Sequence, residues 1–143
     1  MSKLTNDIRK FHEKFGLSYD GLPRTLPHDL EAFRIKFMRE ELEEYISAAS
    51  DRELQRMEHG RNTPLALAEV REKQLDALVD LVYVALGTAY LQGFDFDRAW
   101  NRVHRANMSK VRATKKTAGK RGAPKFDVVK PAGWKAPQLK DLV

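Results

Sequence analysis

The sequence predicts an all-α protein: a helical bundle of about four helices, followed by an irregular basic tail. Apolar residues recur at three- and four-residue spacing through most of the first 111 residues. Gly or Pro stands where these periodic stretches end. The periodicity fails after Val111, where Gly, Pro and Lys become frequent. We therefore divide the chain into a helical core, residues 1–111, and a basic C-terminal extension, residues 112–143.

Each helix is expected from its apolar spacing and its end signals. The four helices should span about 5–15, 28–59, 64–92 and 96–111. Gly60 stops the second helix, and Thr63 before Pro64 is a strong start for the third. Asp95 should cap the fourth helix. Loops are expected at 17–27 and 117–124, and a short extended segment at 126–129.

Two of these helices carry stripes that we expect to face inward. On the second helix the stripe comprises Phe33, Phe37, Met38, Leu42, Tyr45, Ile46 and Ala49. On the fourth it comprises Phe96, Ala99, Trp100, Val103, Ala106, Asn107 and Lys110. The fourth helix and the apolar surplus of the third, which includes Val82, Leu86 and Tyr90, exceed what a thin helical pair can cover, which predicts a homo-oligomer.

The third helix holds two acids in an otherwise apolar stretch, Leu75 to Gly93, that is typical of a buried helix. Asp76 and Asp80 are four residues apart and share a helical face. Buried acids are normally paired with cations or bound to metal. Two interpretations remain at this point: a divalent cation between the aspartates, or an exposed polar stripe.

A second acidic cluster, Glu40-Glu41-Leu42-Glu43-Glu44, lies on the second helix. Glu41 and Glu44 share one face, and an antiparallel helix pair can place them opposite Asp76 and Asp80. Four carboxylates favour Mg²⁺ or Mn²⁺ over softer metals. A di-iron bundle would need Glu-x-x-His, and no histidine in the chain has Glu three residues before it. The alternative is that the acids are solvated surface.

Composition excludes several classes of protein. The chain has no cysteine, which excludes disulfides, thiolate zinc sites and cysteine nucleophiles. The N-terminus is polar and lacks a signal-peptide pattern, and the longest apolar run is shorter than a membrane span and contains two acids. We expect a soluble, cytoplasmic protein that does not bind membranes.

The positive charge of the chain lies in its C-terminal tail. Residues 109–143 carry ten Lys or Arg against two Asp. Such a tail could bind nucleic acid or a polyphosphate ligand, or could simply be solvated.

Three segments resemble one enzyme family: EELEEY, LDALVDLVYVALGTAYLQGFD and VHRANMSK. They are similar to the MazG-like branch of the all-α nucleoside triphosphate pyrophosphohydrolases, related to phosphoribosyl-ATP pyrophosphohydrolase, over about residues 7–110. Glu40, Glu41 and Glu44 fit the family's Glu-Glu-x-x-Glu, and Asp80 fits its final aspartate. The other acid departs from the pattern, because Ala77 stands three residues before Asp80, and Asp76 is the available substitute.

The resemblance implies Mg²⁺- or Mn²⁺-dependent hydrolysis of a nucleoside or deoxynucleoside triphosphate to the monophosphate and pyrophosphate. The metal ligands would be Glu41, Glu44, Asp76 and Asp80. Glu40 and Glu41 would be catalytic, and Glu40 or Glu43 could accept a proton from the attacking water. Asn107 and Lys110 would contact the nucleotide, although both also suit an ordinary helix end.

The tail and the N-terminal helix complete the predicted site. Phe15, with Phe11 and His12, offers a stacking surface that slightly favours purines. Phage enzymes that this sequence resembles often act on purine deoxynucleotides, so the resemblance implies dGTP or GTP as the substrate. Lys125 and Lys130 would contact phosphates of a neighbouring subunit in a tetramer built as a dimer of dimers. Phage or bacterial origin is expected. The alternative function is that of a helical nucleic-acid-binding protein that uses the basic tail without catalysis, although nucleic acid is the less favoured partner. A weaker alternative is a catalytically inactive protein used for assembly.

Overall fold

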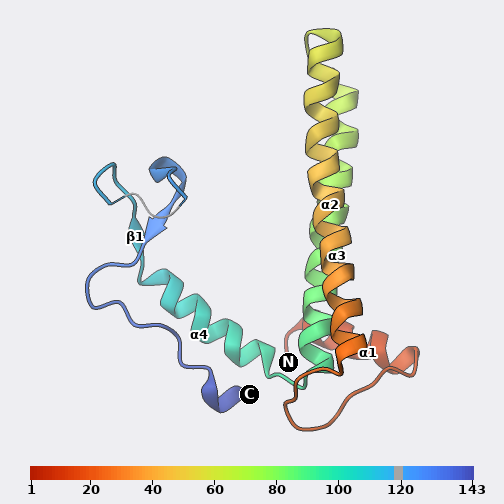
Figure 1. Ribbon diagram of the computed structural model, residues 1–143, viewed down its shortest axis with the longest axis vertical. Coiled ribbons are helices and arrows are strands. Elements are labelled where there is room, and N and C mark those ends of the chain that lie inside the picture. The colour runs from red at the N-terminus through yellow and green to blue at the C-terminus, as the bar shows by residue number, and fades with distance from the viewer. Residues whose placement is uncertain (118–120) are drawn as a thin grey trace. The chain divides into compact units, whose positions relative to one another are not determined.

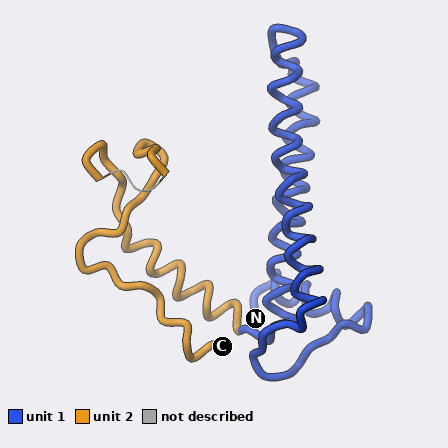
Figure 2. The backbone as a smooth tube through the Cα atoms, viewed as in Figure 1, with its two compact units in different colours: residues 1–94 blue, residues 95–143 orange. Residues whose placement is uncertain are grey.

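The computed structural model describes residues 1–117 and 121–143, which form two compact units, residues 1–94 and 95–143 (Figure 2). The boundary falls before the fourth helix, whereas our division at residue 111 marks the end of helical periodicity and stays a prediction. The mostly helical fold with four helices is confirmed.

The first unit is a long antiparallel hairpin with a short helix at its open end (Figure 1). Its helices are α1 (Lys3–Lys14), α2 (His28–His59) and α3 (Pro64–Leu91). Gly60, with φ of 68°, ends α2 in the left-handed conformation. The Thr63 hydroxyl accepts a hydrogen bond from the Ala66 N–H, as expected of an N-cap. The hairpin therefore brings the middle of α2 beside the middle of α3.

A seven-residue repeat forms the seam between α2 and α3. On α2 the buried residues are Arg34, Glu41 and Ala48. On α3 they include Val70, Ala77, Val84 and Leu91. This repeat is typical of coiled-coil packing, in which a narrow stripe of each helix faces its single partner.

The wider apolar faces expected to be buried are largely exposed in the single chain. On α2, Phe33, Leu42 and Ile46 are exposed, so the predicted inward stripe is wrong for these residues. The prediction of a buried stretch from Leu75 onward is also wrong at its start, since exposed apolar side chains occupy that part: Leu75, Leu78, Val79 and Val82. The physical reason is that one partner helix covers only the seam.

The loop before α2 is fixed to the end of α3. The Arg24 N–H donates to the Gln92 carbonyl at 2.9 Å, and the Tyr19 N–H donates to the Tyr90 hydroxyl at 3.2 Å. Gly93 has φ of 71°, and a Cβ there would lie 3.0 Å from the Gly21 carbonyl oxygen, so a larger residue would push the loop away. This loop therefore holds α1 near the open end of the hairpin.

The second unit contains α4 (Phe96–Met108) and two short antiparallel strands, β1 (Val111–Arg112) and β2 (Val128–Val129). Single-turn helices η1 (Pro124–Phe126) and η2 (Lys140–Leu142) complete it. The extended segment predicted at 126–129 is confirmed for β2, and part of the loop predicted at 117–124, residues 118–120, lies outside the described residues.

The inward stripe predicted on α4 differs from the structure. No residue of α4 is fully buried in the single chain, and Trp100 is 61% exposed. The helix also ends at Met108, so Lys110 does not continue its stripe. The reason is local: the Ser109 hydroxyl donates to the Ala106 carbonyl at 2.7 Å, and the Lys110 N–H donates to the Asn107 carbonyl, so the last turn closes on itself.

By length and composition alone, α3 is the one helix in residues 1–117 and 121–143 that could cross a membrane. Core helices of soluble proteins pass the same test, and α3 carries Asp76 and Asp80 on its exposed and half-buried positions. The expectation that the protein does not bind membranes stays a prediction.

Candidate active site

Glu41 is the most unusual carboxylate of the hairpin. It lies on the α2 seam with only 7% of its surface exposed, and its Oε2 has no hydrogen-bond partner. Burial raises the pKa of Glu41 above its ordinary value, and repulsion from Glu44, Asp80, Glu40 and Asp76 raises this pKa further. The two acidic clusters predicted from the sequence therefore face one another across the hairpin.

The other predicted ligands are more exposed than Glu41. Asp80 is half-buried, whereas Glu44 and Asp76 are exposed. The expectation that both aspartates are buried is thus wrong for Asp76, because it lies off the narrow seam. Glu40 is also exposed, and its Oε1 lies 3.7 Å from the Lys36 ammonium group.

A pocket of about 170 Å³ adjoins the acids and receives side chains from α1, α2 and α3. Its lining residues are Phe11, His12, Arg34, Phe37, Glu41, Asp80, Tyr83 and Val84. The lining therefore combines two acids, Glu41 and Asp80, with aromatic, basic and apolar side chains. Pockets for whole drug-sized ligands measure about 300–1,000 Å³, so this pocket can enclose only part of a nucleotide.

Aromatic rings form one wall of this pocket. The Phe11 ring meets the Tyr83 ring edge-on, with centroids 5.4 Å apart, and it also contacts Phe15 at 4.8 Å. Phe15 is largely exposed and reaches the pocket only through Phe11. The buried His12 ring lies 4.7 Å from the Tyr90 ring, and its Nδ1 is 2.8 Å from the Ile8 carbonyl oxygen. Of the predicted base-contacting residues, Phe11 and His12 line the pocket directly, and Phe15 does not.

Sequence reasoning missed Arg34, the buried cation of the same pocket. Its Nη2 donates to the Val84 carbonyl oxygen at 2.6 Å, and its Nε donates to the Thr88 hydroxyl at 3.0 Å. Burial lowers the pKa of Arg34 from its ordinary value. A Cβ on Gly87 would lie 2.8 Å from Arg34 Nη2, so glycine makes room for the guanidinium. The sequence feature that indicates burial of Arg34 is its seven-residue spacing from Glu41, which places both residues on the same stripe of α2.

The remaining predicted contacts belong to the second unit. Asn107 is exposed in the last turn of α4. The ammonium groups of Lys110 and Lys130 lie 5.8 Å and 4.5 Å from the centroid of the Trp134 ring. Lys125 lies over the ring of Phe126. That these residues contribute to the acidic pocket of the first unit stays a prediction.

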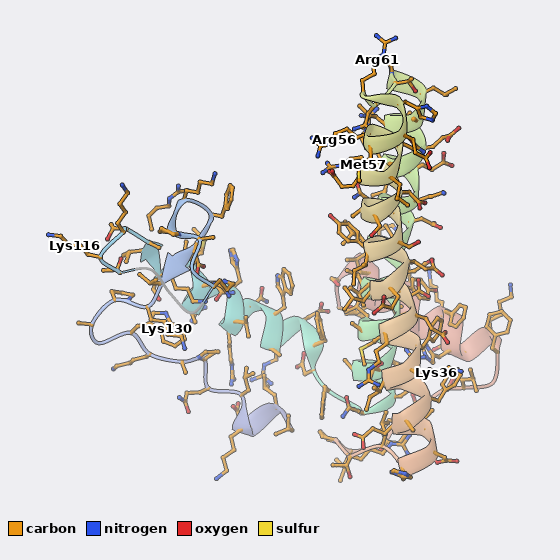
Figure 3. All side chains as sticks on the ribbon, turned by 45° about the horizontal axis from the view of Figure 1, so that its top comes forward. Lys36, Arg56, Met57, Arg61, Lys116 and Lys130 are labelled. Atoms are coloured by element: carbon orange, nitrogen blue, oxygen red, sulfur yellow. The ribbon has the colours of Figure 1, made fainter. Side chains whose placement is uncertain are left out.

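Figure 3 shows how far the closed end of the hairpin lies from α1 and hence from the pocket. Arg56, Met57 and Arg61 project at that end, and Met57 is exposed. The pocket therefore lies away from the closed end, and Glu44 and Asp76 lie near the middle of their helices.

A sequence model of the phosphoribosyl-ATP pyrophosphohydrolase family, PRA-PH, matches residues 8–107. The chain belongs to the PRA-PH family. No curated protein matches the chain. PRA-PH membership implies nucleotide pyrophosphohydrolase activity on a nucleotide substrate, which confirms the predicted all-α pyrophosphohydrolase class. The matched region contains both acidic clusters and Asn107, whereas Lys110, Lys125 and Lys130 lie beyond it.

The acids of this PRA-PH member fit a hard divalent cation, as the generally metal-dependent family implies. In the part of the chain that the structure describes, no three Asp, Glu or His side chains are already grouped as metal ligands. The unpartnered Glu41 oxygen and the surrounding carboxylates nevertheless supply the oxygen donors that Mg²⁺ or Mn²⁺ prefers. A cation there would offset the repulsion that raises the pKa of Glu41.

Proposed function

We propose that this PRA-PH family member hydrolyses a nucleoside or deoxynucleoside triphosphate to the monophosphate and pyrophosphate, with Mg²⁺ or Mn²⁺ as cofactor. The observation that carries the proposal is Glu41: a buried carboxylate with an unpartnered oxygen, facing other carboxylates beside a pocket. Such a group is unfavourable in the free protein and becomes favourable when a cation is bound.

Four acids would hold the cation: Glu41, Glu44 and Asp80, with Asp76 as the substitute for the family's remaining acid. A triphosphate carries several negative charges, so this acidic surface accepts it only with positive charge between them. When bound, the divalent cation neutralises phosphate oxygens and promotes deprotonation of water.

An exposed carboxylate would complete the proton transfer. The water oxygen forms a bond to phosphorus, the bridging bond between the α- and β-phosphates breaks, and the water proton passes to Glu40 or Glu43. Glu40 remains accessible on α2 and is only loosely associated with Lys36. Lys110 and Asn107 would contact the leaving pyrophosphate and stabilise its negative charge.

The finer identity of the enzyme is also part of the proposal. We propose a MazG-like enzyme of phage or bacterial origin that works in the cytoplasm. A purine nucleotide such as dGTP or GTP is proposed as its substrate, which the aromatic wall of the pocket supports. Exposed apolar stripes on α2 and α3 support a homotetramer, built as a dimer of dimers. Lys125 and Lys130 would then contact phosphates bound to a neighbouring subunit.

The test is pyrophosphate release from the eight common ribo- and deoxynucleoside triphosphates, with Mg²⁺, with Mn²⁺ and with a chelator. We expect turnover that requires the divalent cation. No pyrophosphate release from any of the eight nucleotides, together with salt-dependent binding to DNA or RNA, would favour the nucleic-acid-binding alternative.

A further inference from the structure

Arg34 and His12 form a donor and acceptor pair in the pocket wall. The Arg34 guanidinium has five N–H groups, of which Nε and Nη2 each donate one bond to α3. The His12 Nδ1 must donate to the Ile8 carbonyl, because a carbonyl oxygen only accepts. In the neutral imidazole, Nε2 is then the hydrogen-bond acceptor.

Gly87 shows that these two groups are neighbours. A Cβ built on Gly87 would lie 2.8 Å from Arg34 Nη2 and 3.5 Å from His12 Nε2. Both nitrogen atoms therefore surround one point on the α3 surface, and both residues line the pocket. With this tautomer, the Arg34 donor stands beside the His12 acceptor nitrogen within walls formed by Phe11, Phe37 and Tyr83.

The distance along the hairpin suits a nucleotide. Arg34 and Glu41 are seven residues apart on α2, which is about 10 Å along a helix. The flat ring of a base would lie beside Arg34, against the aromatic side chains there, and its phosphates would extend toward Glu41 and the exposed acids. The small pocket volume agrees with enclosure of the base alone.

We infer that Arg34 and His12 recognise the lactam edge of a base, the adjacent C=O and N–H found in guanine, hypoxanthine, uracil and thymine. Arg34 donates to the carbonyl oxygen, and His12 Nε2 accepts from the ring N–H. Adenine and cytosine present an amino group and an unprotonated ring nitrogen instead, so donors and acceptors are reversed. The inference rests on the proposed function, since it names the bases that the same site selects.

Matched nucleotide pairs test this inference. dITP and dATP differ only in the edge concerned, and so do dUTP and dCTP. We expect the wild-type kcat/KM to be at least about tenfold higher for the lactam member of each pair, because one well-formed pair of hydrogen bonds discriminates by about 1–3 kcal/mol.

Variants of Arg34 and Gly87 then test whether the Arg34 and His12 side chains cause the selectivity. Arg34→Gln and Gly87→Ala, the latter displacing both side chains, should reduce both selectivity ratios toward one. A ratio of two substrates does not depend on the fraction of folded enzyme, so partial unfolding does not obscure the result. Arg39→Gln, an exposed arginine on α2, is the matched control and should keep both ratios.

The outcomes separate the two proposals. Equal or reversed ratios in an active wild-type enzyme would overturn the lactam inference and leave the pyrophosphohydrolase standing, as would ratios that persist in Arg34→Gln. No turnover on any nucleotide would overturn the proposed function, and with it the inference.

Discussion

Glu41 on α2 and Asp80 on α3 line the same pocket, and the charge of Asp80 contributes to the raised pKa of Glu41. Burial is the larger cause of the raised pKa. The hairpin places Asp80 beside a buried carboxylate whose ionisation it disfavours, which is the arrangement expected of a cation site.

This arrangement predicts how the stability of the metal-free protein depends on pH. Because the folded-state pKa of Glu41 lies above its ordinary 4.5, the folded chain binds that proton more tightly than the unfolded chain. Its contribution to stability is therefore full below pH 4.5 and is lost as pH rises through the folded-state pKa. Because glutamine does not ionise, Glu41→Gln should lack this loss of stability. The melting temperature of Glu41→Gln should therefore rise relative to that of the wild type as pH increases through this range. Thermal unfolding in chelator checks it, and a difference that is constant with pH would contradict it.

The two aspartates of α3 should differ in importance. Asp80 is half-buried and lines the pocket, whereas Asp76 is exposed and faces a groove with Glu72 and Lys73. We expect Asp80→Asn to lower kcat/KM for pyrophosphate release at least about a hundredfold, and Asp76→Asn to lower it about tenfold. Glu72→Gln is the matched control. Equal losses in the two aspartate variants would make Asp76 a full ligand.

Exposed apolar stripes predict self-association. Leu78 and Val82 lie exposed on α3 and line a groove of about 290 Å³ against α1. Light scattering at micromolar concentration should give a mass of several chains, and Val82→Asp should reduce it. Leu22→Asp, which changes an exposed apolar residue in the loop, should leave the mass unchanged. A monomeric wild type would refute the proposed tetramer.

The C-terminal residues should detach when the charge of Asp141, which pairs with Arg102 and Arg98, is removed. Asp141 accepts two hydrogen bonds from Arg102 of α4, at 2.5 Å and 2.8 Å, and this pairing lowers the pKa of Asp141 to about 2. The stabilisation is present above the ordinary 3.8 and is lost as pH falls toward 2. Asp141→Asn should speed amide exchange at residues 139–143 without changing the melting temperature, because the pair is exposed. Lys140→Gln is the control, and equal exchange in both variants would show that the pair does not hold the segment.

The ends of the helices were predictable, because short-range chemistry sets them. Gly60, Thr63 and Asp95 act as the sequence indicates, through a left-handed backbone or a side-chain cap. Lys110 was misplaced because the hydrogen bonds of Ser109 close α4 earlier than its periodicity suggests.

The buried faces were less predictable, for a physical reason. Spacing identifies every apolar stripe but does not say which stripe meets the partner helix, and here the seam is a seven-residue repeat that includes Arg34 and Glu41. An arginine is expected at the surface, so its burial depends on a tertiary feature, the space left by Gly87. The acidic clusters were predictable because two acids interrupt an apolar helix.

The most direct test compares magnesium-dependent pyrophosphate release by wild type and Glu41→Gln on the best substrate of the eight-nucleotide panel. Circular dichroism is used to check that both are helical, and Glu31→Gln, which changes an exposed carboxylate on the same helix, serves as the control. We predict at least about a hundredfold loss of kcat/KM in Glu41→Gln and wild-type activity in Glu31→Gln. Turnover in Glu41→Gln equal to that of wild type would contradict the assignment of Glu41 as the centre of the site.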